Sequence, residues 1–95
     1  MKVRFTEAAE HDLEAIGDAL AHHDPVRAVE AIKRLRVAAR SIGRAPKLCP
    51  PVPWSAIPRL RKKHAGSYLL LFQLNGDEVL VLRIAHERSD WVSLV

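Results

Sequence analysis

The sequence contains a single cysteine, Cys49, among its 95 residues. One thiol cannot form an intramolecular disulfide framework or supply a thiolate-built zinc site, and such sparing use of cysteine is typical of a reducing compartment. Cys49 lies between Leu48 and two prolines. This setting favours a buried or half-buried structural thiol over a reactive nucleophile.

Long apolar runs are also missing. The run Leu69–Phe72 has only four residues, whereas a membrane-spanning helix needs about 20. The N-terminal residues lack the basic region and the apolar region of a signal peptide. We therefore expect a soluble protein of the cytoplasm with no membrane segment.

The sequence lacks the short motifs of common enzyme classes. It has no nucleophile elbow, phosphate loop or dinucleotide fingerprint. Its five histidines include no His-x-x-x-His pair. His22 and His23 are adjacent, and on a helix adjacent side chains point about 100° apart. We therefore expect no metal site and no cofactor.

The middle of the sequence, residues 25–63, has an excess of basic residues. Of the 95 residues, 48% are hydrophobic and 27% are charged, which is typical of one globular domain over residues 1–95. Residues 1–24 carry six acids, whereas residues 25–63 carry eleven bases and one acid. This segment predicts an anionic partner, either nucleic acid or an acidic protein segment. The alternative for its helical half is a solvated helix face.

The first half of the chain is predicted to form a strand and two helices. Val3 and Phe5 alternate with polar residues, as in a strand with one buried face. Thr6 is a suitable N-cap for a helix that ends at His22-His23, and Asp24-Pro25 starts a second helix that ends near Gly43. The short turn between the two helices predicts an antiparallel hairpin.

The second half is predicted to form three antiparallel strands. Residues 46–58 include five prolines and indicate an extended loop. Strands are expected at 57–63, 67–74 and 79–85, with turns at 65–66 and 75–77. The expected fold class is α+β: an N-terminal strand, a two-helix antiparallel hairpin, and a three-stranded antiparallel meander.

A first cluster of basic residues covers Arg59–Lys63. Strand alternation would place Arg59, Arg61 and Lys63 on one face, with Leu60 and Lys62 on the other. Three cations in a row are typical of a surface that contacts phosphates. The alternative is an edge strand whose charges prevent aggregation.

A second cluster follows the last strand and contains Arg83, His86 and Arg88. If both clusters met on one concave face, they could bind an anion, or His86 could act as a general base beside stabilising arginines. The alternative is an ion pair between Arg88 and Asp90, with His86 as an ordinary hydrogen-bonded residue at the strand end.

The order of these motifs resembles the RelE/ParE superfamily of bacterial type II toxins. Phe5–Ile16 is similar to the family pattern F-T-x-x-A-x-x-D-L-x-x-I, and Arg83–Asp90 to the ParE ending R-V-x-H-x-R-x-D. Further similar segments are Ala28–Leu35, Pro58–Arg61 and Gly66–Tyr68. The resemblance covers nearly the whole chain and implies a toxin-like α+β fold.

The resemblance implies one of two activities. The ParE branch poisons DNA gyrase by binding, which would give target-contacting roles to Arg59, Arg61, Lys63, Arg83, His86, Arg88 and Trp91. The RelE branch cleaves messenger RNA on the ribosome, which would make His86, Arg61, Lys63, Arg83 and Arg88 the catalytic candidates. Trp91 occupies the position of a RelE-like tyrosine, and tryptophan cannot transfer a proton. The His-x-Arg-x-Asp spacing and this tryptophan favour the ParE-like gyrase inhibitor.

The resemblance also implies a cognate antitoxin whose acidic C-terminal segment wraps the toxin in a hetero-oligomer. The residues expected to contact it are Leu13, Ile16, Leu20, Val29, Lys62 and Lys63. A basic block beside an edge strand is a surface that an acidic amphipathic peptide could cover. A plain nucleic-acid-binding module is the other class of function, but none of the five aromatic residues lies between basic residues on a strand as a stacking platform.

Overall fold

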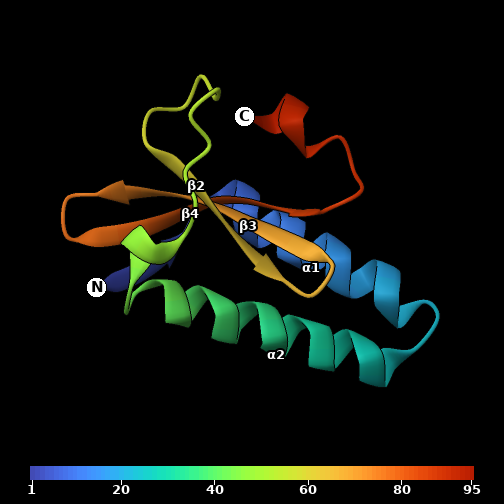
Figure 1. Ribbon diagram of the computed structural model, residues 1–95. Helices are drawn as coiled ribbons and strands as arrows, with labels where there is room; N and C mark the ends of the chain where they lie inside the picture. The colour runs from blue at the N-terminus through green and yellow to red at the C-terminus, as the bar shows by residue number, and fades with distance from the viewer.

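Six regular elements and two short 3-10 helices form the domain in the computed structural model, which describes all residues 1–95. The elements are β1 (Lys2–Phe5), α1 (Glu7–Ala21), α2 (Pro25–Ile42), η1 (Pro46–Leu48), β2 (Leu60–Ala65), β3 (Tyr68–Asn75), β4 (Glu78–His86) and η2 (Trp91–Leu94). The predicted fold class is confirmed: a strand, a helical hairpin and an antiparallel meander follow one another along the chain (Figure 1).

The start of β2 differs from the prediction. The sequence pattern indicated a strand from Ile57, whereas the strand begins at Leu60. Arg59 has a φ of 57°, in the left-handed region that residues with a Cβ seldom adopt. Pro58 precedes it and has no backbone N–H to donate. The chain therefore turns at these two residues before it enters the sheet.

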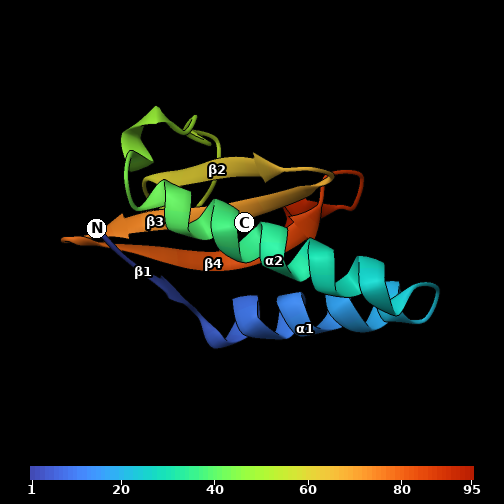
Figure 2. The same cartoon turned by 90° about the horizontal axis from the view of Figure 1, so that it is seen from below.

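All four strands form one sheet in the order β1-β4-β3-β2. β4 pairs antiparallel with β3, and β3 antiparallel with β2, as the meander requires. β1 pairs parallel with β4, with Val3 opposite Val79 and Phe5 opposite Val81. The helical hairpin follows β1 in the chain and covers one face of the sheet (Figure 2).

Both helices begin at the predicted caps. The Thr6 hydroxyl accepts a hydrogen bond from the Ala9 amide at 3.1 Å. The Asp24 carboxylate accepts from the amides of Val26 and Arg27 at 3.1 and 3.2 Å. Each cap satisfies amides that have no partner within their own helix.

The core lies between the helical hairpin and the sheet. Its largest fully buried side chains include Phe72 and Leu70 of β3, Val79 and Val81 of β4, and Leu35 of α2. Cys49 is 8% exposed and belongs to this core, which confirms the predicted buried thiol.

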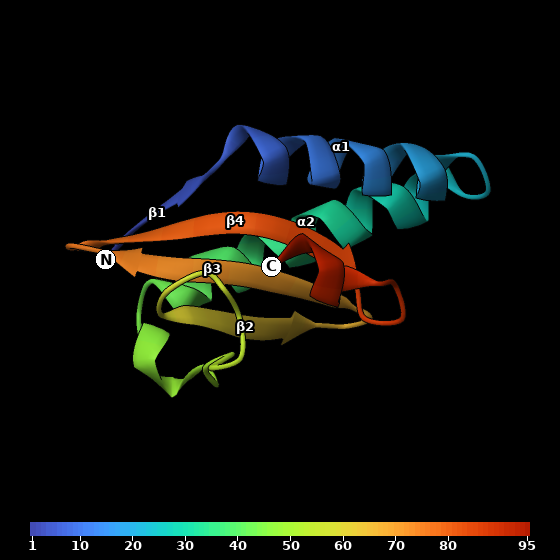
Figure 3. The same ribbon diagram turned by 90° about the horizontal axis from the view of Figure 1, so that it is seen from above.

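The opposite face of the sheet carries a second, smaller cluster of Val52, Leu60 and Leu71, with Trp91 and Val95 packed against it. The C-terminal segment crosses this face, as seen from above in Figure 3. The central strand β3 is thus covered on both faces. This explains why Leu69–Phe72 is a continuous apolar run rather than an alternating one.

A β-bulge interrupts β4. Leu71 pairs with Arg83 whereas Phe72 pairs with Val81, so Leu82 is an extra residue in β4. The bulge changes the alternation of side chains along this strand. Val81 lies in the helix-side core before it and Ile84 lies in the same core after it.

The two helical-hairpin glycines predict opposite responses to the same substitution. A Cβ on Gly43 would lie 2.6 Å from the Met1 carbonyl oxygen, so Gly43→Ala should lower the free energy of unfolding by about 1–3 kcal/mol. A Cβ on Gly17 would meet only Ile32 atoms at 3.4 and 3.5 Å, so Gly17→Ala should raise it by up to about 1 kcal/mol. Urea unfolding of both variants measures the difference; equal destabilisation would contradict it.

Candidate functional site

Arg83 is held by an ion pair with α1. The Asp12 carboxylate accepts hydrogen bonds from Arg83 Nε at 2.8 Å and Nη2 at 2.9 Å, and from the Ile84 amide at 2.9 Å. β1 pairs with β4 only as far as Val81, so the strand edge beyond it needs other partners. Asp12 supplies one of them, and the Thr6 hydroxyl donates to the Leu82 carbonyl at 2.8 Å. Arg83 therefore joins α1 to the sheet.

The charge on Arg83 does not change at working pH. Its hydrogen bond to Asp12 raises the pKa of the guanidinium above the usual value, although burial acts in the opposite direction. A group with a raised folded-state pKa contributes stability below its unfolded-state pKa and loses it only as the pH rises through the folded value. For arginine both the folded-state and the unfolded-state pKa lie far above neutral pH. The contribution of the Arg83 charge to stability is therefore constant near pH 7.

The predicted row of Arg59, Arg61 and Lys63 does not form. Arg59 precedes the strand because the chain turns there. Arg61 donates from Nη1 to the Cys49 carbonyl at 2.6 Å, which fixes the proline-rich loop to β2. Lys63 lines a shallow hollow beside the end of α2 that also includes Ser41 and Leu48.

A tryptophan surface lies on the face of the sheet away from the helices, and we define it as Trp54, Lys62 and Trp91. The two indole rings are 5.7 Å apart at an interplanar angle of 43°. The Lys62 ammonium lies 5.6 Å from the centre of the Trp91 ring, a cation–π contact. Trp54 is 56% exposed. The surface combines aromatic area with positive charge.

The C-terminal residues that carry Trp91 are fixed to the proline-rich loop. The Val95 carbonyl accepts hydrogen bonds from the Ser55 hydroxyl at 2.8 Å and from the Ala56 amide at 3.3 Å.

The Arg88 side chain is exposed, forms no ion pair and makes no hydrogen bond within the chain, so the alternative pair with Asp90 is absent.

His86 lies on the helix side of the sheet, away from the tryptophan surface. It pairs across the strands with Tyr68, and the two rings are 5.4 Å apart in an edge-to-face arrangement. His86 Nδ1 accepts a hydrogen bond from the Arg88 amide at 3.0 Å, which places the proton of the neutral ring on Nε2. The hollow that His86 lines includes none of Arg59, Arg61 and Lys63, so the two clusters predicted from the sequence do not meet in it.

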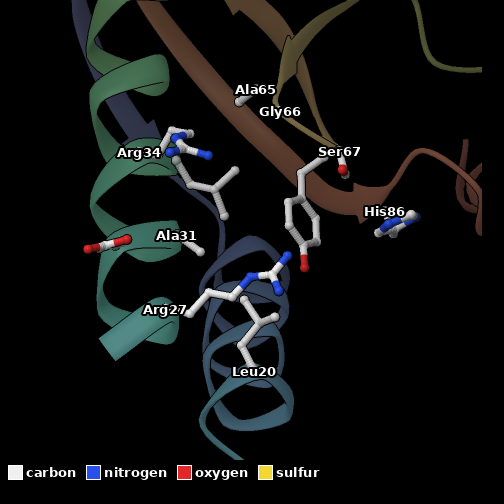
Figure 4. A pocket seen from close by; sticks show the side chains of 11 residues that line it. Leu20, Arg27, Ala31, Arg34, Ala65, Gly66, Ser67 and His86 are labelled. Carbon is white, nitrogen blue, oxygen red and sulfur yellow. The ribbon is translucent and has the colours of Figure 1, made fainter. Parts of the chain in front are cut away.

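A cavity of about 450 Å³ lies beside His86. Arg27 and Arg34 extend into it from α2, Leu20 lines it from α1, and His86 lies on its far side (Figure 4). Sequence analysis did not single out Arg27, Arg34 or Tyr68. The available signal was the seven-residue spacing of the two arginines, which places them on one side of a helix.

The residues expected to contact an antitoxin differ in exposure. Leu13 is 3% exposed and is packed in the core, while Ile16 and Leu20 are half-buried. Val29 is 54% exposed and lines an apolar hollow of about 320 Å³ between the helices. Lys62 and Lys63 are half-buried on β2.

We name the exposed apolar residues of α2 the valine stripe: Val26, Val29 and Val37. They are 67%, 54% and 51% exposed, and the helical period places them on one side of α2. Valine is a modest helix former, so helix propensity alone does not explain three exposed valines. Their clustering is typical of an interaction surface.

No helix has the length and hydrophobicity needed to cross a membrane. No group of three or more histidine, cysteine, aspartate or glutamate side chains is arranged to hold a metal ion.

Two solved structures share this fold. A chain from the chromosomal ParDE toxin–antitoxin system of P. aeruginosa matches with a TM-score of 0.78 and 24% identity, over 90% of this chain and 95% of that chain. A chain from the toxin–antitoxin complex RelBE2 of Mycobacterium tuberculosis matches with a TM-score of 0.67 and 21% identity, over the same shares of the two chains. The chain therefore shares the fold of these two chains.

The family model described as the ParE toxin of the type II toxin–antitoxin system parDE matches residues 3–91. The chain belongs to the ParE toxin family, which confirms the branch favoured by the sequence. No curated protein matches it in sequence.

Proposed function

We propose that this ParE-family toxin inhibits DNA gyrase by binding it, and that a cognate antitoxin neutralises it. Gyrase inhibition by binding is supported by one observation: the residues that a ribonuclease would use for catalysis do not surround one site. Arg83 is paired with Asp12, Arg61 is bonded to the Cys49 carbonyl, and His86 faces the helices. A general base acts on phosphate only when it and the stabilising cations surround one reacting group. This arrangement favours binding over cleavage.

The tryptophan surface and the exposed Arg88 are the proposed contacts with the target. Tryptophan and arginine are enriched among the residues that dominate binding energy at protein interfaces. Trp91 keeps the target-contacting role that the sequence suggested, and Trp54 and Lys62 add to it through their contacts with the Trp91 ring. Arg88 is free to contact a partner because its side chain has no partner within the chain.

The helical hairpin is the proposed contact with the antitoxin. The valine stripe supplies exposed apolar area on α2, and Ile16 and Leu20 of α1 are half-buried. α2 carries five bases and a single acid, Glu30. An amphipathic antitoxin segment with acidic residues would match both properties.

Pulse labelling after induction of the toxin without its antitoxin tests the proposed target. We expect incorporation of DNA precursors to stop before incorporation of amino acids, together with a DNA-damage response. Purified gyrase should accumulate cleaved DNA when the toxin is added. An early stop in translation while DNA synthesis continues would contradict gyrase inhibition and favour the ribonuclease.

His86→Gln separates the two activities at the level of one residue. A ribonuclease that used His86 as its general base would lose about 10²–10⁴-fold in rate. A gyrase inhibitor should keep most of its toxicity, because His86 lies on the helix side of the sheet and not in the tryptophan surface. Growth inhibition at matched expression measures the effect, with the melting temperature as a control for folding.

A further inference from the structure

The cavity beside His86 contains two arginines without an internal partner. Neither Arg27 nor Arg34 forms an ion pair or donates a side-chain hydrogen bond within the chain, although both line the cavity. Arg34 approaches the turn between β2 and β3, since a Cβ on Gly66 would lie 3.8 Å from its Nη1. The two guanidinium groups thus lie at a hollow between α2 and the sheet with their donors free.

Further donors come from the sheet side of the same cavity. Tyr68 and Ser67 line it, and neither hydroxyl makes a hydrogen bond within the chain. Arginine offers a planar set of N–H groups that fits a carboxylate or phosphate through two parallel hydrogen bonds. Cations and hydroxyl groups around one hollow are a suitable lining for an oxyanion.

The rest of the lining favours a carboxylate over a phosphate. Glu30 lies at the cavity between the two arginines in sequence, and its negative charge would repel a doubly charged phosphate more than a singly charged carboxylate. Leu20, Ala31 and Leu35 supply an apolar wall. Such a wall suits the methylene groups and apolar neighbours of an acidic residue in a peptide.

The cavity is also next to the valine stripe on the same helix. The side chains of α2 rotate by about 100° per residue, so Val26 and Arg27 point to neighbouring sides of the helix. Further along α2, Arg34 and Val37 are three residues apart and likewise point to neighbouring sides of the helix. A peptide that crosses the exposed side of α2 can therefore place apolar residues on the stripe and an acidic residue in the cavity.

We propose that this cavity binds a carboxylate of the antitoxin, with the Arg27 and Arg34 guanidinium groups and the Tyr68 hydroxyl as hydrogen-bond donors. The proposal rests on the proposed function, because it assigns one residue type of the antitoxin to one place on the toxin. The pairing would fix the register of the antitoxin segment along α2, since it joins a charged group to a defined position.

The first experiment measures antitoxin affinity by calorimetry for Arg27→Gln and Arg34→Gln. Each variant should weaken binding by about tenfold or more, because hydrogen bonds to a charged group are lost. Arg40→Gln is the matched control: Arg40 is an exposed arginine of the same helix that does not line the cavity. Arg27→Gln and Arg34→Gln variants that bind like Arg40→Gln would overturn the proposal.

A second experiment does not depend on the antitoxin. The side-chain Nε–H signals of arginine are followed by NMR while N-acetyl-Leu-Glu-Leu-amide is added to the full chain, with the glutamine version of the peptide as control. We expect saturable shifts at Arg27 and Arg34 with the glutamate peptide alone. A cavity that responds to inorganic phosphate or a thymidine oligonucleotide, and not to the glutamate peptide, would overturn the proposal.

The two experiments together separate the proposal from the proposed function. If the toxin binds no antitoxin but the glutamate peptide shifts the Arg27 and Arg34 signals, the proposed neutralisation by an antitoxin fails and the carboxylate site stands. If antitoxin binds with full affinity to both arginine variants, the proposed binding of an antitoxin stands and the carboxylate site fails.

Discussion

Asp12→Ala is expected to lower the free energy of unfolding by about 2–4 kcal/mol. The substitution removes the acceptor of three hydrogen bonds at once, two from Arg83 and one from the Ile84 amide. The Ile84 amide would then lack a partner at a strand edge that β1 does not reach. For a domain of this size the melting temperature should fall by roughly 10 °C or more. Thermal and urea unfolding measure the loss.

Two further variants show whether the loss comes from this ion pair. Glu14→Ala is the matched control, because Glu14 is an exposed acid of the same helix with no ion pair. It should change stability by less than about 0.5 kcal/mol. Asp12→Asn keeps an acceptor for the Ile84 amide but loses the charge. Its loss in the free energy of unfolding should therefore lie between those of Asp12→Ala and Glu14→Ala. Asp12→Ala that unfolds like Glu14→Ala would contradict the structural role of the pair.

The Asp12–Arg83 pair changes the interpretation of any Arg83 variant. The sequence suggested that Arg83 contacts the target. On that basis, loss of toxicity in Arg83→Ala would be interpreted as loss of a target-binding residue. The structure gives Arg83 a partner 71 residues away in the chain. Loss of toxicity in that variant is expected to accompany a lower melting temperature. Arg88→Ala should lose toxicity without that change, because its side chain is free.

The elements that local chemistry determines could be predicted from the sequence. Thr6 and Asp24 cap the two helices as expected, because an N-cap depends only on amides two or three residues away. The short turn after Ala21 gives the helical hairpin for the same reason. The parallel pairing of β1 with β4 was not predicted, since no local pattern in Lys2–Phe5 specifies a partner so far along the chain.

The candidate site was less predictable because it depends on side-chain direction in a strand with a bulge. Simple alternation assumes no extra residue, but Leu82 is inserted relative to β3 and shifts the pattern after it. His86 then faces the helices, while Trp91 packs on the opposite face. The left-handed Arg59 likewise breaks the predicted row of cations, and nothing in its residue type indicates that conformation.

Val29→Arg is expected to weaken antitoxin binding by about 100-fold and to leave toxicity intact. Val29 lies in the valine stripe beside an apolar hollow, and a buried charge there would lack a partner in the complex. Because Val29 is 54% exposed in the free toxin, the fold should tolerate the change. Val92→Arg is the matched control, since Val92 is 50% exposed but lies on η2, across the sheet from the helices. Calorimetry measures the affinity and co-expression measures neutralisation.

Arg88→Ala should give the reverse result, with toxicity lost and antitoxin binding retained. The two variants thus test whether the toxin uses separate surfaces for its two partners: the helical hairpin for the antitoxin, and Arg88 together with the tryptophan surface for gyrase. If both faces are separate, each variant removes one function and preserves the other. If Val29→Arg also loses toxicity while remaining folded, or Arg88→Ala also loses antitoxin binding, the partners share a surface. The antitoxin would then neutralise the toxin by direct competition, and the separate-face arrangement would be wrong.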